Sequence, residues 1–205
     1  MPADDPTAAD RLAGIIDFLQ AAAQLKDTLR SARTAKGRAE STAEHSWRLC
    51  LMVMMFERDL PGYDISRLLK LCLVHDLGEA IHGDTPAVEQ RCDPDRAGRE
   101  RADLITLCAP LPADLQRSML ALWDDYATEA SPEAVLAKGF DKLETMLQHA
   151  IGRNDPGFDY AFNLTYGAAQ TRRHPLLTAL RALVDARTRD RIARPGSAFP
   201  ERPDA

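Results

Sequence analysis

The chain has 205 residues, a formal net charge of −5 and a pI near 5.5. This length suffices for one domain with its own hydrophobic core, held without disulfides. The acidic balance argues against a general binder of nucleic acid polymers, which usually presents a basic face. A small anionic substrate is compatible with it, because a local cation outweighs the global charge at a site.

Helical periodicity dominates the sequence, and no strand-like alternation of useful length occurs in it. Ser41 and Glu44 form a capping-box pattern at the start of the second helix, and Pro132 suits the first turn of the sixth. The helices are expected over about 7–29, 41–60, 64–81, 101–109, 113–129, 132–151 and 175–192.

Polar segments separate these helices. Residues 30–38 are cationic with one glycine, which is typical of a loop. Residues 87–100 are expected to be partly looped, and residues 154–157 to form a turn. We predict an all-α fold with a single domain over residues 1–192 and a Pro/Gly-rich, disordered tail over residues 193–205.

The sequence also predicts where the protein works. No apolar run approaches the roughly 18 residues that a membrane span needs, and the acidic start lacks the pattern of a signal peptide. None of the four cysteines forms a CxxC pair, and we interpret them as reduced, mostly buried thiols. We therefore expect a cytoplasmic protein that does not bind membranes. The cysteines are Cys50, Cys72, Cys92 and Cys108.

Two histidines and two aspartates lie on otherwise apolar helical stretches: His45, the adjacent pair His75 and Asp76, and Asp141. Two imidazoles and two carboxylates suit a divalent cation such as Mn, Co, Fe, Ni or Zn. Four protein ligands leave positions on an octahedral ion for water and substrate. The set therefore favours hydrolysis over a closed structural site.

Two further carboxylates are expected beside this set. Glu79 lies four residues after His75, on the same face of the expected helix. Asp84 lies on the turn that follows that helix, where its side chain can overhang the site.

Each candidate ligand also has a purely structural interpretation. A lone histidine on an apolar helix is more often a core residue than a ligand. For Asp76 and Asp141 the alternative is a salt bridge to a cation such as Lys142, since an unpaired buried carboxylate is costly.

The segments around these residues resemble the HD-domain metal-dependent phosphohydrolases. More narrowly, they are similar to the bacterial 5′-deoxynucleotidases of the YfbR type and their eukaryotic relatives, over roughly residues 12 to 150. The histidine–aspartate pair alone is nonspecific, whereas the ordered set of segments is specific. These segments are Glu40–Arg48, Leu73–Ala80, Gly83-Asp84, Leu122–Tyr126 and Asp141–Glu144.

The resemblance implies a helical bundle with a metal site in its centre, commonly a homodimer. It implies an enzyme that uses one divalent ion, with Mg added to the candidates above, to remove phosphate from deoxynucleoside 5′-monophosphates. Arg30, fifteen residues before His45, matches the arginine that contacts the phosphate. The metal ligands implied are His45, His75, Asp76 and Asp141, and the catalytic carboxylates are Glu79 and Asp84.

One position departs from the family pattern. The residue after the arginine is a tryptophan in the bacterial enzyme, where it helps to exclude ribonucleotides, and it is Ser31 here. This difference concerns the sugar preference rather than the hydrolysis. We therefore expect deoxynucleoside or nucleoside 5′-monophosphates as substrates.

Three other functions stay open at this point. Another HD phosphohydrolase, acting on a cyclic dinucleotide, a triphosphate or an alarmone, would keep the metal site and change the pocket. A mixed-valent di-iron oxygenase needs more histidine ligands between Asp76 and Asp141, where only His82 lies. A non-catalytic nucleotide-binding module has no need for a water-activating carboxylate such as Glu79.

The remaining side chains of interest are expected to be structural. His82 is predicted at an exposed helix end, and His149 and His174 carry no site signal. Cations of the 30–38 loop suit a phosphate approach path and a solvated face equally: Arg33, Lys36 and Arg38. Core packing is predicted for Trp47, Trp123, Met52, Met54 and Met55.

Overall fold

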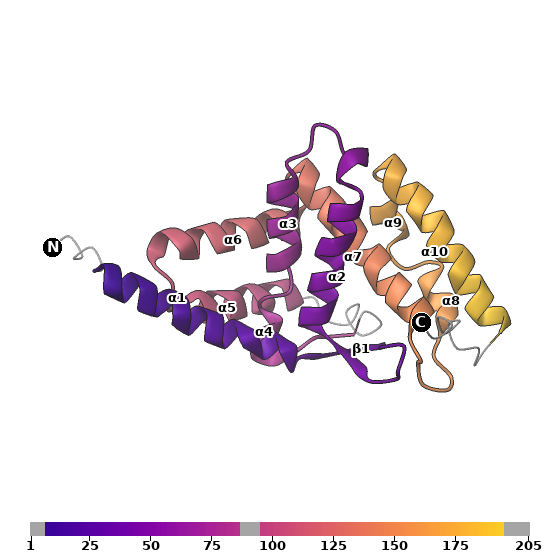
Figure 1. Cartoon of the computed structure of the whole chain (residues 1–205), viewed down its shortest axis with the longest axis horizontal. Helices are drawn as coiled ribbons and strands as arrows, with labels where there is room; N and C mark the ends of the chain where they lie inside the picture. Colours follow the sequence, from indigo (N-terminus) through magenta and orange to yellow (C-terminus); the bar gives the residue numbers. More distant parts are fainter. Residues whose placement is uncertain (1–6, 87–94, 195–205) are drawn as a thin grey trace, which may run out of the picture.

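The computed structural model describes residues 7–86 and 95–194. Within these ranges the chain is a helical bundle with one two-stranded sheet (Figure 1), which confirms the all-α prediction. The longer helices are α1 (Ala8–Ala22), α2 (Thr42–Met55), α3 (Ile65–Val74), α5 (Arg96–Cys108), α6 (Ala113–Thr128), α7 (Pro132–Ile151) and α10 (Pro175–Ala193). Short helices are α4 (Glu79–His82), α8 (Tyr160–Asn163) and α9 (Ala168–Thr171), and the 3₁₀ turns are η1 (Ala23–Lys26) and η2 (Glu57–Asp59).

Helix α7 is the centre of the bundle, and it packs against α2, α3, α6, α9 and α10. Its start is set by Pro132 in the first turn and by Ser131, whose side chain accepts a hydrogen bond from the Ala134 amide. The main core forms between α7 and its neighbours, where burial of apolar area drives folding. Its fully buried members include Phe140, Leu143, Met146, Leu49, Val53, Leu68 and Leu71.

A second apolar cluster lies where α1, α5 and α6 meet, in the part of the molecule on the left of Figure 1. Phe18 of α1 and Trp123 of α6 belong to it. Helix α1 approaches the α5–α6 connection closely at Gly14, where an added Cβ would lie 2.1 Å from the carbonyl oxygen of Pro110. The absence of a side chain at this position therefore determines how closely α1 packs.

The prediction of a loop over residues 30–38 is wrong in part. This segment belongs to an antiparallel hairpin of β1 (Leu29–Arg33) and β2 (Ala39–Ser41). The strands are short and irregular, and their burial does not alternate, so no period-two signal marks them. The side-chain amide of Gln148 on α7 donates to the Arg33 carbonyl at 2.5 Å. The hairpin is thereby fixed against the central helix, and it carries Arg30.

The helix predicted to run unbroken to Ile81 is interrupted after Val74. The His75 amide still donates to the Leu71 carbonyl at 3.1 Å, but the next amides bond three residues back. Leu77 donates to Val74 at 3.1 Å and Glu79 to Asp76 at 3.0 Å. Such bonds tighten the chain into 3₁₀-like turns. The histidine–aspartate pair therefore lies on the connection between α3 and α4 and not inside a regular helix.

Other boundaries differ less. The first helix ends at Ala22 and is followed by η1 and, from Leu29, by β1. Helix α5 begins five residues earlier than predicted, and α8 and α9 were not expected. Most of the polar segment 87–100 and nearly all of the predicted tail over 193–205 lie outside the described residues. None of the helices in the described parts of the chain combines the length and apolar character that a membrane span requires.

Gly14→Ala tests the close approach of α1. Alanine normally stabilises a helix interior relative to glycine, but here its methyl group would overlap a backbone oxygen. We expect a loss of about 1 to 3 kcal/mol in the free energy of unfolding, measured by denaturant unfolding.

The matched control is Gly98→Ala on α5. There the nearest atom to an added Cβ, at 2.9 Å, is a carboxylate oxygen of Asp95, and that side chain can rotate away. This variant should be as stable as the parent or more so. Equal or greater stability of the Gly14 variant would show that α1 does not pack as described.

Candidate metal centre

The four predicted ligands come together from α2, the α3–α4 connection and α7. The capping box predicted for α2 is present: the Ser41 hydroxyl accepts from the Glu44 amide at 3.3 Å, and the Glu44 carboxylate accepts from the Ser41 amide at 2.9 Å. It sets the first turn of α2, so that His45 points inward with 0% of its side chain exposed. Asp141 reaches the same place from the middle of α7.

The donor atoms of these residues nearly touch. His45 Nε2 lies 3.4 Å from His75 Nε2 and 3.3 Å from Asp141 Oδ1. His75 Nε2 lies 2.9 Å from Asp76 Oδ2 and 3.9 Å from Asp141 Oδ1. Donors bound to one ion at about 2.0–2.2 Å lie about 3.0–3.5 Å from one another. The described side chains therefore fit a single divalent cation with little movement, and His45, His75 and Asp76 form one of two clusters of such donors in the described residues.

The second nitrogen of each imidazole has its own partner. His75 Nδ1 lies 2.9 Å from the carbonyl oxygen of Cys72, and His45 Nδ1 pairs with the carboxylate of Glu144. A ring that donates from Nδ1 keeps the lone pair of Nε2 for a metal. Both rings are therefore held in the orientation of a ligand, with Nε2 facing the same point.

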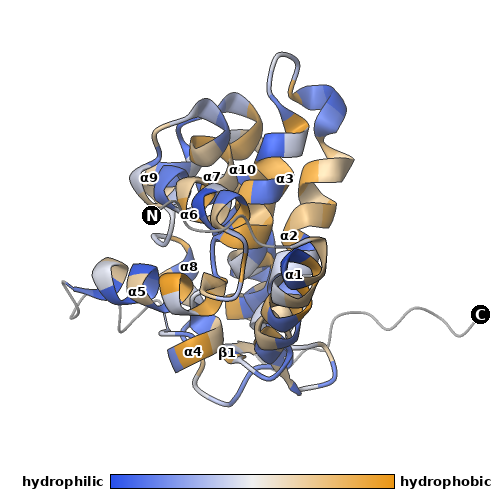
Figure 2. Cartoon of the chain, turned by 90° about the vertical axis from the view of Figure 1, so that its left-hand side faces the viewer, coloured by the Kyte–Doolittle hydropathy of each residue, from blue (hydrophilic) through white to orange (hydrophobic). Residues whose placement is uncertain are grey.

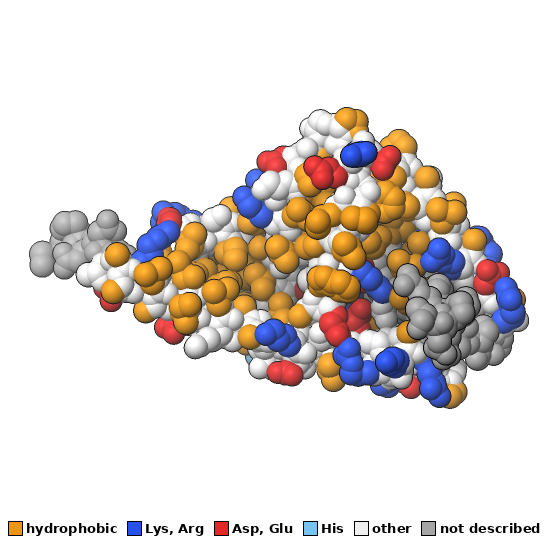
Figure 3. All heavy atoms as spheres, viewed as in Figure 1, with side chains coloured by type: hydrophobic (Ala, Val, Ile, Leu, Met, Phe, Trp, Pro, Cys, Tyr) orange, Lys and Arg blue, Asp and Glu red, His pale blue; other side chains and the backbone are white. Residues whose placement is uncertain are grey.

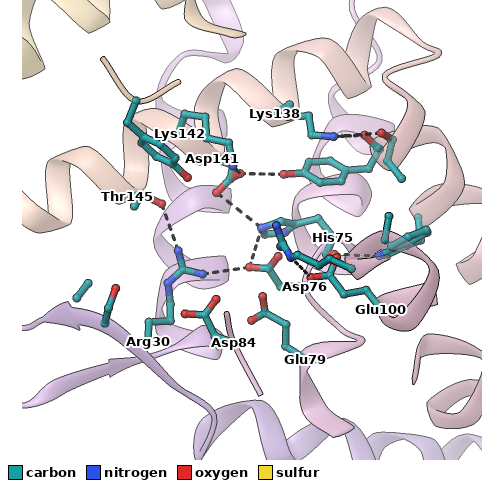
Figure 4. Close-up of a pocket in the computed structure, with 18 of the residues that line it drawn as sticks. Arg30, His75, Asp76, Glu79, Asp84, Glu100, Lys138, Asp141, Lys142 and Thr145 are labelled. Atoms are coloured by element: carbon teal, nitrogen blue, oxygen red, sulfur yellow. Dashed lines mark hydrogen bonds and ion pairs between the residues drawn. The ribbon is translucent and has the colours of Figure 1, made fainter. Parts of the chain in front are cut away.

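Both aspartates also bind cations, Asp141 through its outer oxygen and Asp76 through the same oxygen, Oδ2, that faces the histidines. Asp141 Oδ2 accepts from Lys142 Nζ at 2.8 Å and from the Tyr126 hydroxyl at 2.9 Å, while its Oδ1 faces the histidines. Arg30 donates to Asp76 Oδ2 at 3.2 Å. The salt bridges considered from the sequence are thus present, but they leave the donors converged, and Figure 4 shows three of them, those of His75, Asp76 and Asp141.

A second donor cluster lies on the other side of His45, formed with Glu40 and Glu144. Here Arg48 Nε donates to Glu144 Oε1 at 2.7 Å, and Arg30 lies 3.9 Å from Glu40. Arg48 thus neutralises Glu144, whereas Glu40 Oε2 has no hydrogen-bond partner and burial raises the pKa of Glu40 to about 7. A metal is therefore favoured on the Nε2 side of His45, and Glu144 is better described as the group that orients His45.

A cavity of about 320 Å³ opens beside the converged donors. Figure 4 shows Arg30, Glu79 and Asp84 around it, with Asp76 and His75 at its centre. Arg30 reaches it from β1 and also donates to the Thr145 hydroxyl at 3.2 Å. The sequence-predicted site residues thus line or adjoin one cavity, and Ser31 is also among the residues that line it.

The carboxyl groups around the cavity fall into two electrostatic classes. Burial raises the pKa of Asp76, but His75 and Arg30 outweigh it and bring the pKa below its usual value. Burial also raises the pKa of Asp141, but Lys142, His45 and His75 together outweigh it and bring the pKa well below its usual value. By contrast, burial and the charges of Asp76 and Asp84 raise the pKa of Glu79 to about 9. The two aspartates are therefore ionised at neutral pH, while Glu79 carries a proton.

Several functional neighbours were not recognised in the sequence. Glu144 and Lys142 were quoted only as part of a motif or as a possible salt-bridge partner. Glu144 lies three residues after Asp141, so helical spacing places both on one face. His149, for which no role was predicted, lines the cavity, with Nδ1 2.9 Å from the side-chain oxygen of Asn163. Trp123 is buried as predicted, and its indole donates to the His75 carbonyl at 3.1 Å.

The later cations of the 30–38 segment and His82 lie away from the cavity. Arg33 pairs with Asp155 at 2.7 Å, and Arg38 pairs with Glu44. Neither of these cations nor Lys36 is among the residues that line the cavity, which favours the solvated face for them. His82 is exposed and lies 2.8 Å from Asp103, as expected for a histidine at a helix end.

Comparison with known proteins agrees with this geometry. The model of the HD domain family matches residues 22–181. The mouse protein named 5′-deoxynucleotidase HDDC2 is 32% identical over 138 residues, which are 66% of this chain and 68% of that protein. Its human counterpart is 32% identical over 136 residues, which are 65% of this chain and 66% of the human protein. The chain thus spans about two thirds of the length of these curated relatives.

A solved structure resembles the whole bundle. It is a predicted metal-dependent phosphohydrolase from Magnetospirillum magnetotacticum, with a TM-score of 0.72 and 25% sequence identity over 93% of this chain and 100% of that chain. The family and this neighbour imply a divalent metal, for which the converged histidines and carboxylates supply suitable donors. The family model covers more than half of the sequence, and the chain therefore belongs to the HD domain family.

Proposed function

We propose that this protein is a metal-dependent phosphohydrolase that removes phosphate from deoxynucleoside or nucleoside 5′-monophosphates. One observation carries the proposal: two imidazoles and two carboxylates converge on one point beside a cavity that also holds an arginine and two further carboxylates. The names of the curated relatives support the substrate class. The cavity volume, about 320 Å³, lies at the small end of the range for small-molecule sites.

In this proposal His45, His75, Asp76 and Asp141 hold one divalent ion. When bound, the ion supplies Lewis acidity, which lowers the pKa of water and draws charge from the phosphate. Lys142 holds the outer oxygen of Asp141, and Arg30 holds Oδ2 of Asp76, the oxygen that faces the histidines. The ligands are thus oriented before an ion arrives, which reduces the cost of binding it.

Arg30 binds the phosphate. Its guanidinium is held between Asp76 and the Thr145 hydroxyl, and only 12% of its side chain is exposed. A guanidinium group fits phosphate oxygens through two parallel hydrogen bonds. Because Arg30 is already fixed by the hairpin and by α7, little conformational entropy is lost when the phosphate arrives.

Glu79 and Asp84 move the protons. Glu79 is buried, accepts from the Thr42 hydroxyl at 3.1 Å, and loses its proton more readily once the charge of Asp76 is neutralised. It can then orient and deprotonate the attacking water. Burial raises the pKa of Asp84 as well, so that this residue can deliver a proton to the leaving 5′-oxygen.

We further propose that the protein is cytoplasmic and works as a homodimer without nucleic acid polymers. The described cysteines, Cys50, Cys72 and Cys108, are free thiols, which is the usual state in a reducing compartment, while Cys92 lies outside the described residues.

The position of His82 favours hydrolysis over di-iron oxygenation. This histidine is exposed and pairs with Asp103, so it does not supply a ligand for a second iron.

The function is tested by phosphate release from deoxy- and ribonucleoside 5′-monophosphates, after chelator treatment and re-addition of Mn, Co, Mg or Zn. We expect no release without metal and release of phosphate when a metal is restored. Activity toward both sugars would fit Ser31. Absence of release with every metal, together with cleavage of cyclic dinucleotides or triphosphates, would contradict the proposed substrate class.

Glu79→Gln and Asp84→Asn test the proton-transfer roles. Each should lower kcat by about 10²- to 10⁴-fold, with little change in metal affinity measured by calorimetric titration. Asp114→Asn is the control, because that carboxylate pairs with Arg11 on the surface at 2.7 Å. Wild-type turnover in either site variant at full metal occupancy would show that the residue does not transfer a proton.

Glu144→Gln tests the orientation of His45. The amide keeps the shape of the side chain but loses the charge that holds the imidazole. Loss of such an outer partner usually weakens metal binding about 10- to 100-fold, and we expect this decrease in a titration of the chelator-treated protein. Exposed Asp17→Asn is the control. Unchanged metal affinity in a folded Glu144 variant would exclude the proposed role.

A further inference from the structure

His149 lies beside the cavity and has no part in the mechanism proposed above. The residue is 6% exposed and is among those that line the cavity. Its Nδ1 lies 2.9 Å from Asn163 Oδ1, and its ring meets that of Phe158 edge-on, with the centroids 4.9 Å apart. Within the described parts of the chain its Nε2 has no hydrogen-bond partner. The imidazole is thus held on two sides and keeps one polar atom for a ligand.

Asn163, on α8, fixes the orientation of this imidazole. The residue is 0% exposed, and Nδ2 of its amide has no partner among the described residues. A buried, unpaired N–H₂ group costs free energy and therefore calls for a specific explanation, which the contact with His149 provides. The amide oxygen can only accept, so His149 Nδ1 donates to it and Nε2 carries the lone pair. Burial lowers the pKa of His149 below its usual value, so the ring is neutral at neutral pH and suits a hydroxyl group better than a phosphate.

Thr145 places a hydroxyl group between His149 and Arg30. It lies one turn before His149 on α7, on the same face of the helix, and Figure 4 shows it beside Arg30. Its oxygen accepts from Arg30 at 3.2 Å, so its own hydrogen is available for a ligand. Small residues of β1, Ser31 and Ala32, line the same cavity. A phosphate bound at Arg30 would therefore have Thr145 next to it and His149 about 5.4 Å further along the helix.

Polar groups elsewhere in the cavity already have partners. Arg96 and Glu100 come from α5, which lies at the edge of the bundle in Figure 2, and they pair with each other at 2.5 Å. Lys138 donates to the carbonyl oxygens of Tyr126 and Ala127, both at 3.2 Å. These groups would have to give up contacts before they bound a ligand, whereas Nε2 of His149 would not.

The two tryptophans do not offer an open surface for the nucleobase. Trp47 was expected in the core, as were Met54 and Met55, yet these side chains are 65%, 52% and 64% exposed. They belong to the apolar exterior of α1 and α2 that Figure 3 shows, and they are not among the residues that line the cavity. Trp123 lines it but is only 5% exposed. The polar groups beside Arg30 are therefore the stronger basis for binding the nucleoside.

From this arrangement we propose that Thr145 and His149 bind the two neighbouring hydroxyl groups of a ribose, so that the site prefers ribonucleoside 5′-monophosphates to their deoxy forms. The inference rests on the proposed function, because it places the phosphate at Arg30. The Thr145 hydroxyl donates to one sugar oxygen, and the other sugar hydroxyl donates to His149 Nε2.

A deoxyribose would leave one of these two protein groups unpaired. A site that is built to hydrogen-bond a hydroxyl group rejects an analogue that lacks it. The curated relatives carry the name 5′-deoxynucleotidase, and this preference would distinguish the chain from them.

The test compares adenosine 5′-monophosphate with its 2′-deoxy and 2′,3′-dideoxy forms on the metal-restored full chain. We expect kcat/KM to fall about 10- to 100-fold with the first hydroxyl group removed, and again with the second. His149→Ala should lower kcat/KM for the ribonucleotide by a similar factor and leave that for the dideoxy form nearly unchanged. His82→Ala is the matched control, because this exposed histidine pairs with Asp103 outside the cavity, and it should keep the full preference.

The outcomes separate this inference from the proposed function. Phosphate release with equal kcat/KM for the three nucleotides, or with a preference for the deoxy form, would overturn the inference and leave the function standing. So would a preference that folded His149→Ala retains in full. Absence of release from all three would contradict the function, and calorimetric titration of the unmodified protein with the same nucleotides then decides. Tighter binding of the ribonucleotide would support sugar recognition, and equal affinities would overturn it.

Discussion

The contact between His45 and Glu144 joins α2 to the central helix inside the apolar core, and the rest of the site is arranged around it. Neither side chain has exposed surface, so the pair must satisfy its own polar atoms. Burial and Arg30 lower the pKa of His45, but Glu144 and Asp141 outweigh them and raise it to about 10. His45 therefore carries a proton on both ring nitrogens at neutral pH, and a metal that binds Nε2 must displace the proton there. Metal binding is therefore expected to strengthen as pH rises.

The buried carboxylates of the site explain why three cations lie beside it. Carboxylates grouped in a core repel one another unless cations lie beside them. Arg48 on α2 and Lys142 on α7 reach Glu144 and Asp141 from the same helices that carry the histidine and aspartate ligands. The third cation, Arg30, comes from the hairpin, which is fixed to α7 through Gln148. The small sheet thus supplies the charge that the helices lack at this point.

The sequence predicted the helices, and it singled out the histidines and aspartates that the structure brings together, since apolar periodicity and polar residues on apolar helices are local signals. It did not predict the hairpin, whose strands lack alternation, or the break after Val74, which depends on the packing around the pair. The role of Glu144 and the position of His149 follow from contacts between distant segments. Trp47 was misplaced because an apolar residue on an amphipathic helix has the same signal in a core and on an uncovered outer face.

The most direct test of the central claim is a titration of chelator-treated protein with Co²⁺, followed by visible absorption. We predict saturation at one equivalent per chain, weak bands typical of nitrogen and oxygen ligands, no thiolate charge-transfer band, and loss of the signal in His75→Ala. Failure to saturate, a second equivalent of comparable affinity, or a thiolate band would contradict a single site built from His45, His75, Asp76 and Asp141.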